Sequence, residues 1–110
     1  LLGQALESFV VAELTRQAGW SRVPVELFHF RTHAGREVDV VLEHPSGAVV
    51  GVEVKLTASP SSGDFEGLRA LAAASGDRFH RGVLLCLAET AVPFGPRLQS
   101  LPLGALWAEA

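Results

Sequence analysis

Charged residues alternate with valines in two neighbouring segments of the sequence. Residues 49–55 read Val-Val-Gly-Val-Glu-Val-Lys, a spacing typical of a β-strand. Because side chains two residues apart in a strand project from the same face, Glu53 and Lys55 are expected to share one face. The valines at positions 50, 52 and 54 are then expected to point into apolar packing on the other face.

The segment before it, residues 37–44, follows the same pattern. Alternation groups Glu37 with Asp39 on one face and places on the other face Val38, Val40 and Leu42. The short turn Pro45-Ser46-Gly47 joins the two segments and favours their pairing as neighbouring strands. We therefore expect Asp39 and Glu53 to be near neighbours.

The remaining segments predict an α/β fold. An amphipathic helix is expected over residues 2–18, with strands at 25–31, 37–44 and 49–55, a second helix at 64–75 and a buried strand at 81–88. Pro93, Pro96 and Pro102 predict a loop before a closing turn around residues 103–107. The order α-β-β-β-α-β indicates a central mixed sheet flanked by helices, in a single domain that spans residues 1–110.

Composition limits the class of protein. With 110 residues, of which 48% are hydrophobic and 19% charged, the chain suits one globular core. It has one cysteine and no apolar run of the roughly 20 residues that a membrane span needs, so we expect a cytoplasmic protein with no membrane partner. The net charge of −3 argues against tight nucleic-acid binding by this domain alone. The chain contains no methionine and starts inside an expected helix, so we expect a piece of a longer protein.

Two carboxylates brought together in a partly buried place need compensating positive charge, because desolvation and mutual repulsion both raise a pKa. Lys55 alone cannot balance Asp39 and Glu53. A divalent cation bound by both carboxylates and by the backbone carbonyl of Val54 would do so, and hard oxygen ligands favour Mg²⁺ or Mn²⁺. Lys55 could then orient and help deprotonate an attacking water. Glu7, beside the apolar stripe of the first expected helix, is a further candidate ligand.

The residues Arg36-Glu37-Val38-Asp39 and Val52-Glu53-Val54-Lys55, preceded by a helical glutamate, resemble the PD-(D/E)XK nuclease superfamily, including archaeal Holliday-junction resolvases. Valine stands at position 38 where the superfamily motif has proline. The resemblance implies a restriction-endonuclease-like fold and a catalytic set of Glu7, Asp39, Glu53 and Lys55, which hydrolyses DNA with magnesium.

A closer resemblance covers nearly the whole chain, from Gly3-Gln4-Ala5-Leu6-Glu7 to Leu101-Pro102-Leu103. These residues look like a domain of unknown function at the C-terminus of prokaryotic AAA-type ATPases. That resemblance implies a covalently linked ATPase module before Leu1. We also expect that the domain can form a homodimer.

Other readings of the same residues stay open. The acids and Lys55 could be solvated side chains of half-exposed strands, and Glu7 could be a carboxylate at the rim of the helix's apolar stripe. Arg31 and Arg36 could contact phosphate or pair with Glu37 or Glu43 across the strands. At the level of function, the alternative to a nuclease is a catalytically inactive accessory module that binds DNA or a partner of its ATPase.

Overall fold

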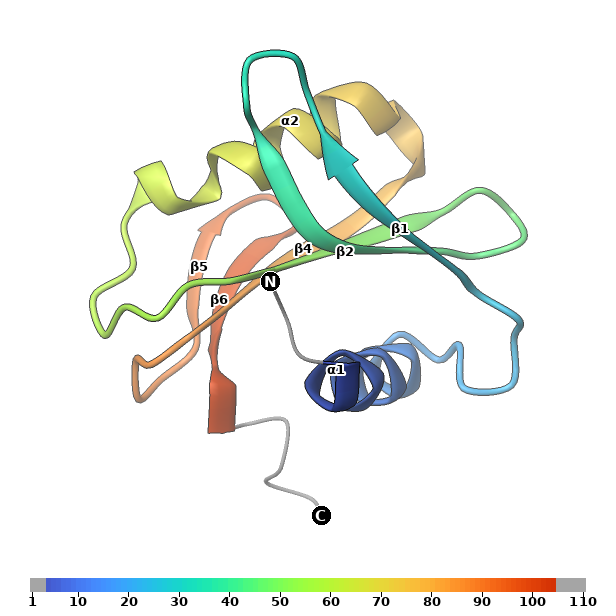
Figure 1. Cartoon of the computed structure of the whole chain (residues 1–110), viewed down its shortest axis with the longest axis horizontal. Helices are drawn as coiled ribbons and strands as arrows, with labels where there is room; N and C mark the ends of the chain where they lie inside the picture. The colour runs from blue at the N-terminus through green and yellow to red at the C-terminus, as the bar shows by residue number, and fades with distance from the viewer. Residues whose placement is uncertain (1–3, 105–110) are drawn as a thin grey trace.

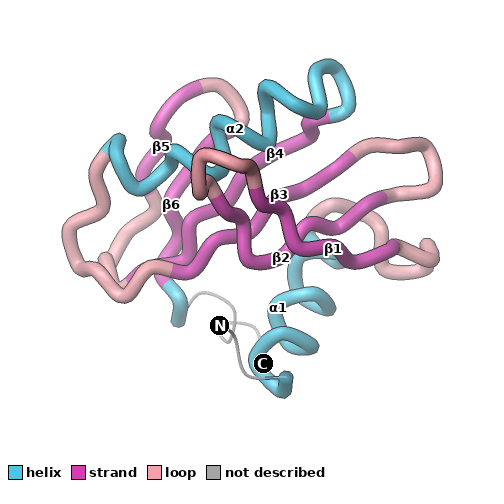
Figure 2. Tube along the Cα trace, turned by 45° about the horizontal axis from the view of Figure 1, so that its top comes forward, coloured by secondary structure: helices cyan, strands magenta, loops and turns pink. Residues whose placement is uncertain are grey.

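The fold is a mixed β-sheet with one long helix on each face (Figures 1 and 2). The structure, a computed structural model, describes residues 4–104, and side chains from residue 8 onward. The helical elements are α1 (Gln4–Gln17), η1 (Ser62–Phe65), α2 (Glu66–Ser75) and η2 (Gly76–Arg78). The strands are β1 (Glu26–Arg31), β2 (Glu37–Glu43), β3 (Val49–Val54), β4 (Phe79–Cys86), β5 (Val92–Gly95) and β6 (Leu98–Pro102).

The strand order across the sheet is β1-β2-β3-β4-β6-β5. β1, β2 and β3 form an antiparallel meander, and the α2 crossover then makes β4 parallel to β3. β6 lies parallel to β4, and β5 pairs antiparallel to β6 at the far edge. This is the α/β fold with a mixed sheet that the sequence predicts, with the helices and first four strands in the expected order.

Each face of the sheet has its own apolar cluster. The cluster under α1 contains the fully or nearly fully buried residues Val10, Leu14, Val40, Leu42, Val50, Val52, Val83 and Leu85. The cluster under α2 contains Val38, Val41, Val49, Phe65, Leu68, Leu71, Phe79, Leu84, Cys86 and Leu98. Strands β3 and β4 contribute to both clusters, as expected for central strands covered on both faces. No helix within residues 4–104 has the length and apolar character needed to cross a membrane.

The tail differs from the expectation of a proline-rich loop. Residues 92–102 form the hairpin of β5 and β6, and β6 is added to the sheet beside β4. The prolines fit because Pro93 lies in the edge strand β5 and Pro102 is the last residue of β6, the positions where a missing backbone N–H is tolerated. The expected closing turn lies partly outside the described residues.

One detail of the predicted alternation in β2 is wrong. Phe28 is opposite Val41 and Phe30 is opposite Val38, so two steps along β1 correspond to three steps along β2. The extra residue is a β-bulge, which places Val38 in the cluster under α2, whereas Val40 lies in the cluster under α1. Asp39 lies at this bulge.

Helix α2 approaches β2 very closely near the bulge. A Cβ atom added to Gly67, in the first turn of α2, would lie 1.9 Å from the carbonyl oxygen of Glu37. An ion pair of 2.7 Å between Arg36, the residue before β2, and Glu66 of α2 lies beside this contact. The absence of a side chain at Gly67 therefore allows the start of α2 to lie directly against the start of β2.

We predict that Gly67→Ala destabilises the protein even though alanine is the better helix former. The added methyl group must push α2 away from a backbone atom, and overpacking of this kind costs about 1–3 kcal/mol. Urea unfolding followed by circular dichroism measures the loss. Gly63→Ala is the matched control, because a Cβ there would come no closer than 3.9 Å to its nearest neighbour, the Oγ of Ser61. Equal stability of the two variants would contradict the close approach.

Candidate functional site

Strands β2 and β3 separate at Asp39, and carboxylate side chains bridge the gap. The last regular pair between the two strands is Val40 with Val52. Beyond it, the backbone N–H of Asp39 donates to Oε1 of Glu53 at 3.2 Å, and the backbone N–H of Val54 donates to Oδ2 of Asp39 at 2.9 Å. Each carboxylate thus binds the backbone of the opposite strand, and the two acids are neighbours as predicted.

Glu53 is buried, with 7% of its surface exposed. Burial raises the pKa of its carboxyl to about 8, with further upward contributions from a hydrogen bond to the Asp39 side chain and from the Asp39 charge. The positive charge of Lys55 and the backbone N–H of Asp39 oppose this rise in pKa without cancelling it. At neutral pH and without a cation, the raised pKa favours the protonated form of Glu53.

Lys55 follows the last residue of β3 and is exposed. It lines, together with Glu53, a surface hollow of about 180 Å³ at the end of β3 and the start of α2. The other charged residues that line this hollow are Arg36, Glu37, Asp64 and Glu66. The lining thus carries four carboxyl groups and two basic groups, and Glu66 is paired with Arg36.

Lys55 is also the only lysine of the chain, since the other eight of the nine basic residues are arginines. A lysine ammonium loses its proton far more readily than a guanidinium, and this property suits proton transfer. The count of lysines in the sequence therefore singles out Lys55, whereas the spacing of the motif residues does not consider that count. It distinguishes Lys55 from the arginines, which supply the rest of the positive charge.

The two arginines near the first hairpin pair with carboxylates. The Nε of Arg31 lies 3.4 Å from Glu37, its partner across β1 and β2, which is one of the pairings considered from the sequence. Arg36 pairs with Glu66 of α2, a partner that spacing along the chain could not indicate. Both ion pairs are exposed, so their contribution to stability is small.

The side chain of Glu7 lies outside the described part of the chain, and its role stays a prediction. Val54 uses its backbone N–H for Asp39, and its carbonyl oxygen stays a predicted ligand. Among side chains of residues 8–104, no three His, Cys, Asp or Glu groups converge on one point.

The donor set of this pair suits a hard divalent cation. Each carboxylate has one oxygen bound to a backbone N–H, which fixes its orientation and leaves the second oxygen to a shared proton or a cation. Burial, followed by the neighbouring Asp39, raises the pKa of the Glu53 carboxyl and so disfavours its charged form. A cation with oxygen preference, such as Mg²⁺ or Mn²⁺, would supply positive charge in place of the proton.

The raised pKa predicts how stability depends on pH. Glu53 binds its proton more tightly in the folded state, with a pKa of about 8 against 4.5 for the free side chain. Its stabilising contribution is complete below pH 4.5 and is lost as the pH rises toward 8. In metal-free buffer, urea unfolding from pH 4.5 to 8 should show wild-type stability falling relative to Glu53→Gln, which stays neutral. A constant difference between the two proteins across this range would disprove the shift.

Comparison with known proteins gives one match. No curated protein and no solved structure matches the chain. A family model described as a domain of unknown function, DUF4143, matches residues 2–106, which is nearly the whole sequence and includes Asp39, Glu53 and Lys55. The chain therefore belongs to the DUF4143 family of domains.

Proposed function

We propose that this domain is a metal-dependent nuclease of the PD-(D/E)XK type, which hydrolyses DNA phosphodiesters. The observation that carries the proposal is the pair of a buried Glu53 and a half-buried Asp39, whose carboxylates are oriented by backbone amides of the opposite strands. Lys55, two residues after Glu53 and beside it in the same hollow, completes the acid and lysine pattern of that superfamily. These features support the proposal independently of the family match, which names no activity.

The residues proposed to hold Mg²⁺ or Mn²⁺ are Asp39, Glu53, the carbonyl of Val54 and, from α1, Glu7. When bound, the ion would polarise the phosphodiester and stabilise the leaving oxygen. Asp39 and Glu53 contribute fixed orientation, because the backbone amides of Val54 and Asp39 restrain their carboxylates. Such restraint means that little reorganisation is needed when a substrate arrives.

Lys55 is proposed to position the attacking water and to take part in its deprotonation. Its ammonium is exposed in the hollow and close enough to Glu53 to affect the pKa of that carboxyl. The negative charge of the hollow makes phosphate binding depend on a bound cation. An ATPase module linked to the domain, as the sequence resemblance implies, could supply the further DNA contacts that a chain of net charge −3 lacks.

The first test is cation binding. Calorimetric titration of Mg²⁺ and Mn²⁺ into the wild type should give saturable binding that Asp39→Asn weakens by at least about tenfold, because one of two charged ligands is lost. Asparagine keeps an oxygen that can accept from the Val54 N–H, so the fold should survive. Asp77→Asn, an exposed aspartate of η2, is the matched control and should bind as the wild type does. Absence of binding by the wild type would refute the metal site.

The second test is cleavage of linear and branched DNA with Mg²⁺ or Mn²⁺. Lys55→Gln should abolish cleavage, or lower its rate by about a hundredfold or more, without weakening cation binding, because general acid–base groups contribute that much to rate. Cation binding without cleavage by the wild type would reject the nuclease proposal. It would favour the second candidate, an inactive accessory module, which the net negative charge and the pairing of Arg36 with Glu66 also favour.

A further inference from the structure

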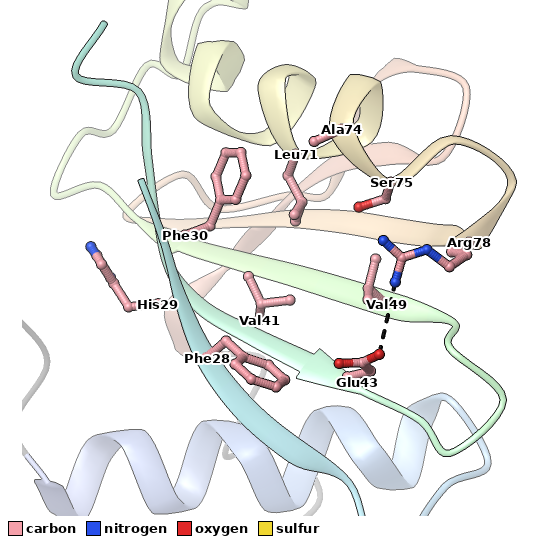
Figure 3. Close-up of a pocket in the computed structure, with 10 residues that line it drawn as sticks. All are labelled: Phe28, His29, Phe30, Val41, Glu43, Val49, Leu71, Ala74, Ser75 and Arg78. Carbon is pink, nitrogen blue, oxygen red and sulfur yellow. Dashed lines mark ion pairs between the residues drawn. The ribbon is translucent and has the colours of Figure 1, made fainter. Parts of the chain in front are cut away.

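His29, in the middle of β1, lies opposite the β-bulge of β2. The regular pairs on the two sides of the bulge are Phe28 with Val41 and Phe30 with Val38. His29 is therefore the single residue of β1 that faces both Asp39 and Val40. Figure 3 shows the ring of His29 on the opposite side of β1 from the rings of Phe28 and Phe30. The imidazole thus projects from β1 at the place where β2 departs from regular pairing.

Both ring nitrogens of His29 face oxygen atoms of β2. Nδ1 lies 3.4 Å from the backbone carbonyl oxygen of Asp39, and Nε2 lies 4.0 Å from Oε1 of Glu37. A carbonyl oxygen only accepts hydrogen bonds, so Nδ1 carries the proton of the first contact and donates it to Asp39. Glu37 has a closer partner in Arg31, at 3.4 Å. The contact that distinguishes His29 is therefore the one with Asp39.

This contact completes the restraint of Asp39. The backbone N–H of Asp39 donates to Oε1 of Glu53 at 3.2 Å, and its carbonyl oxygen accepts from Nδ1 of His29. Its carboxylate accepts from the backbone N–H of Val54 at 2.9 Å. A turn of the Asp39 backbone that moved the carboxylate away from Val54 would strain the bonds on both sides of its Cα atom. Side chains thus hold a residue that the regular strand pairing leaves out.

We propose that His29 is a positioning residue of the candidate site, which holds the carbonyl of Asp39 and so keeps the Asp39 carboxylate on the N–H of Val54. The restraint of Asp39 follows from these contacts alone, whereas its consequence for cation binding rests on the proposed function. His29 acts through Asp39 and is assigned no contact with cation or substrate. Groups that orient a metal ligand in this way support cation affinity without touching the ion.

Two replacements separate the ring nitrogens. The side-chain nitrogen of asparagine takes the place of Nδ1 and that of glutamine takes the place of Nε2, so only His29→Asn keeps the donor to Asp39. Amide hydrogen exchange, measured by NMR, follows the N–H groups of Asp39 and Val54 relative to the amides of β4. Both should exchange about twofold to tenfold faster in His29→Ala and in His29→Gln, the effect of one lost hydrogen bond. His29→Asn should exchange as the wild type does.

The matched control is His33→Ala, which removes an exposed histidine from the turn between β1 and β2. It should leave the exchange of both amides unchanged. Unchanged exchange in His29→Ala as well, or exchange in His29→Asn as fast as in His29→Gln, would overturn the proposal. His29 is itself exposed, so its variants should fold.

Calorimetric titration of Mn²⁺ connects this role to the site. His29→Ala should weaken binding of Mn²⁺ by about tenfold, and His29→Asn should restore it. Wild-type affinity in His29→Ala would overturn the positioning role. A wild type that binds no Mn²⁺ would refute the cation site of the proposed function, and the exchange rates of Asp39 and Val54 would then decide the role of His29 by themselves.

Discussion

The structure around the candidate site depends on two hydrogen bonds between carboxylate side chains and backbone N–H groups, at the point where the pairing of β2 with β3 ends. A continued ladder would pair the backbone groups of the two strands directly. The carboxylates of Asp39 and Glu53 take that place, each accepting from a backbone N–H of the other strand. The bulge in β2 makes this possible, because it re-aims Asp39 while Val38 stays in the core under α2. The result is two fixed carboxylates at the end of an otherwise apolar β3.

The positive charge near the two acids does not offset the effects of burial and of the neighbouring acid on Glu53. Glu53 is buried and the neighbouring Asp39 is half-buried, and both the burial and the adjacent acid raise the pKa of the Glu53 carboxyl. The protein does not place an arginine between the two acids, although it has eight of them in the chain. Its single lysine, Lys55, is exposed and lines the hollow. This arrangement is the reason for our proposal of a cation at the two acids.

The sequence predicts much of this fold and of the neighbourhood of the acids. Alternating valines and charges place Asp39 and Glu53 on adjacent strands, since a period of two is a direct property of strand geometry. The bulge at Asp39 is not predictable in this way, because a single extra residue leaves the local pattern intact and depends on the pairing with β1. The sequence does not predict the hairpin of β5 and β6, because proline is found in strands only at sheet edges and strand ends. Which strand lies at an edge is known only once the sheet is assembled. The pairing of Arg36 with Glu66 depends on α2 docking at Gly67, a tertiary contact.

We propose that a divalent cation, when it binds, replaces the proton held by Glu53. The most direct measurement is calorimetric titration of Mn²⁺ at pH 7 in two buffers of different protonation enthalpy, which counts protons released as the ion binds. With a pKa of about 8 for Glu53, the wild type should release about one proton per ion. Glu53→Gln should release almost none. Binding of Mn²⁺ by the wild type without proton release, or no binding at all, would contradict the claim.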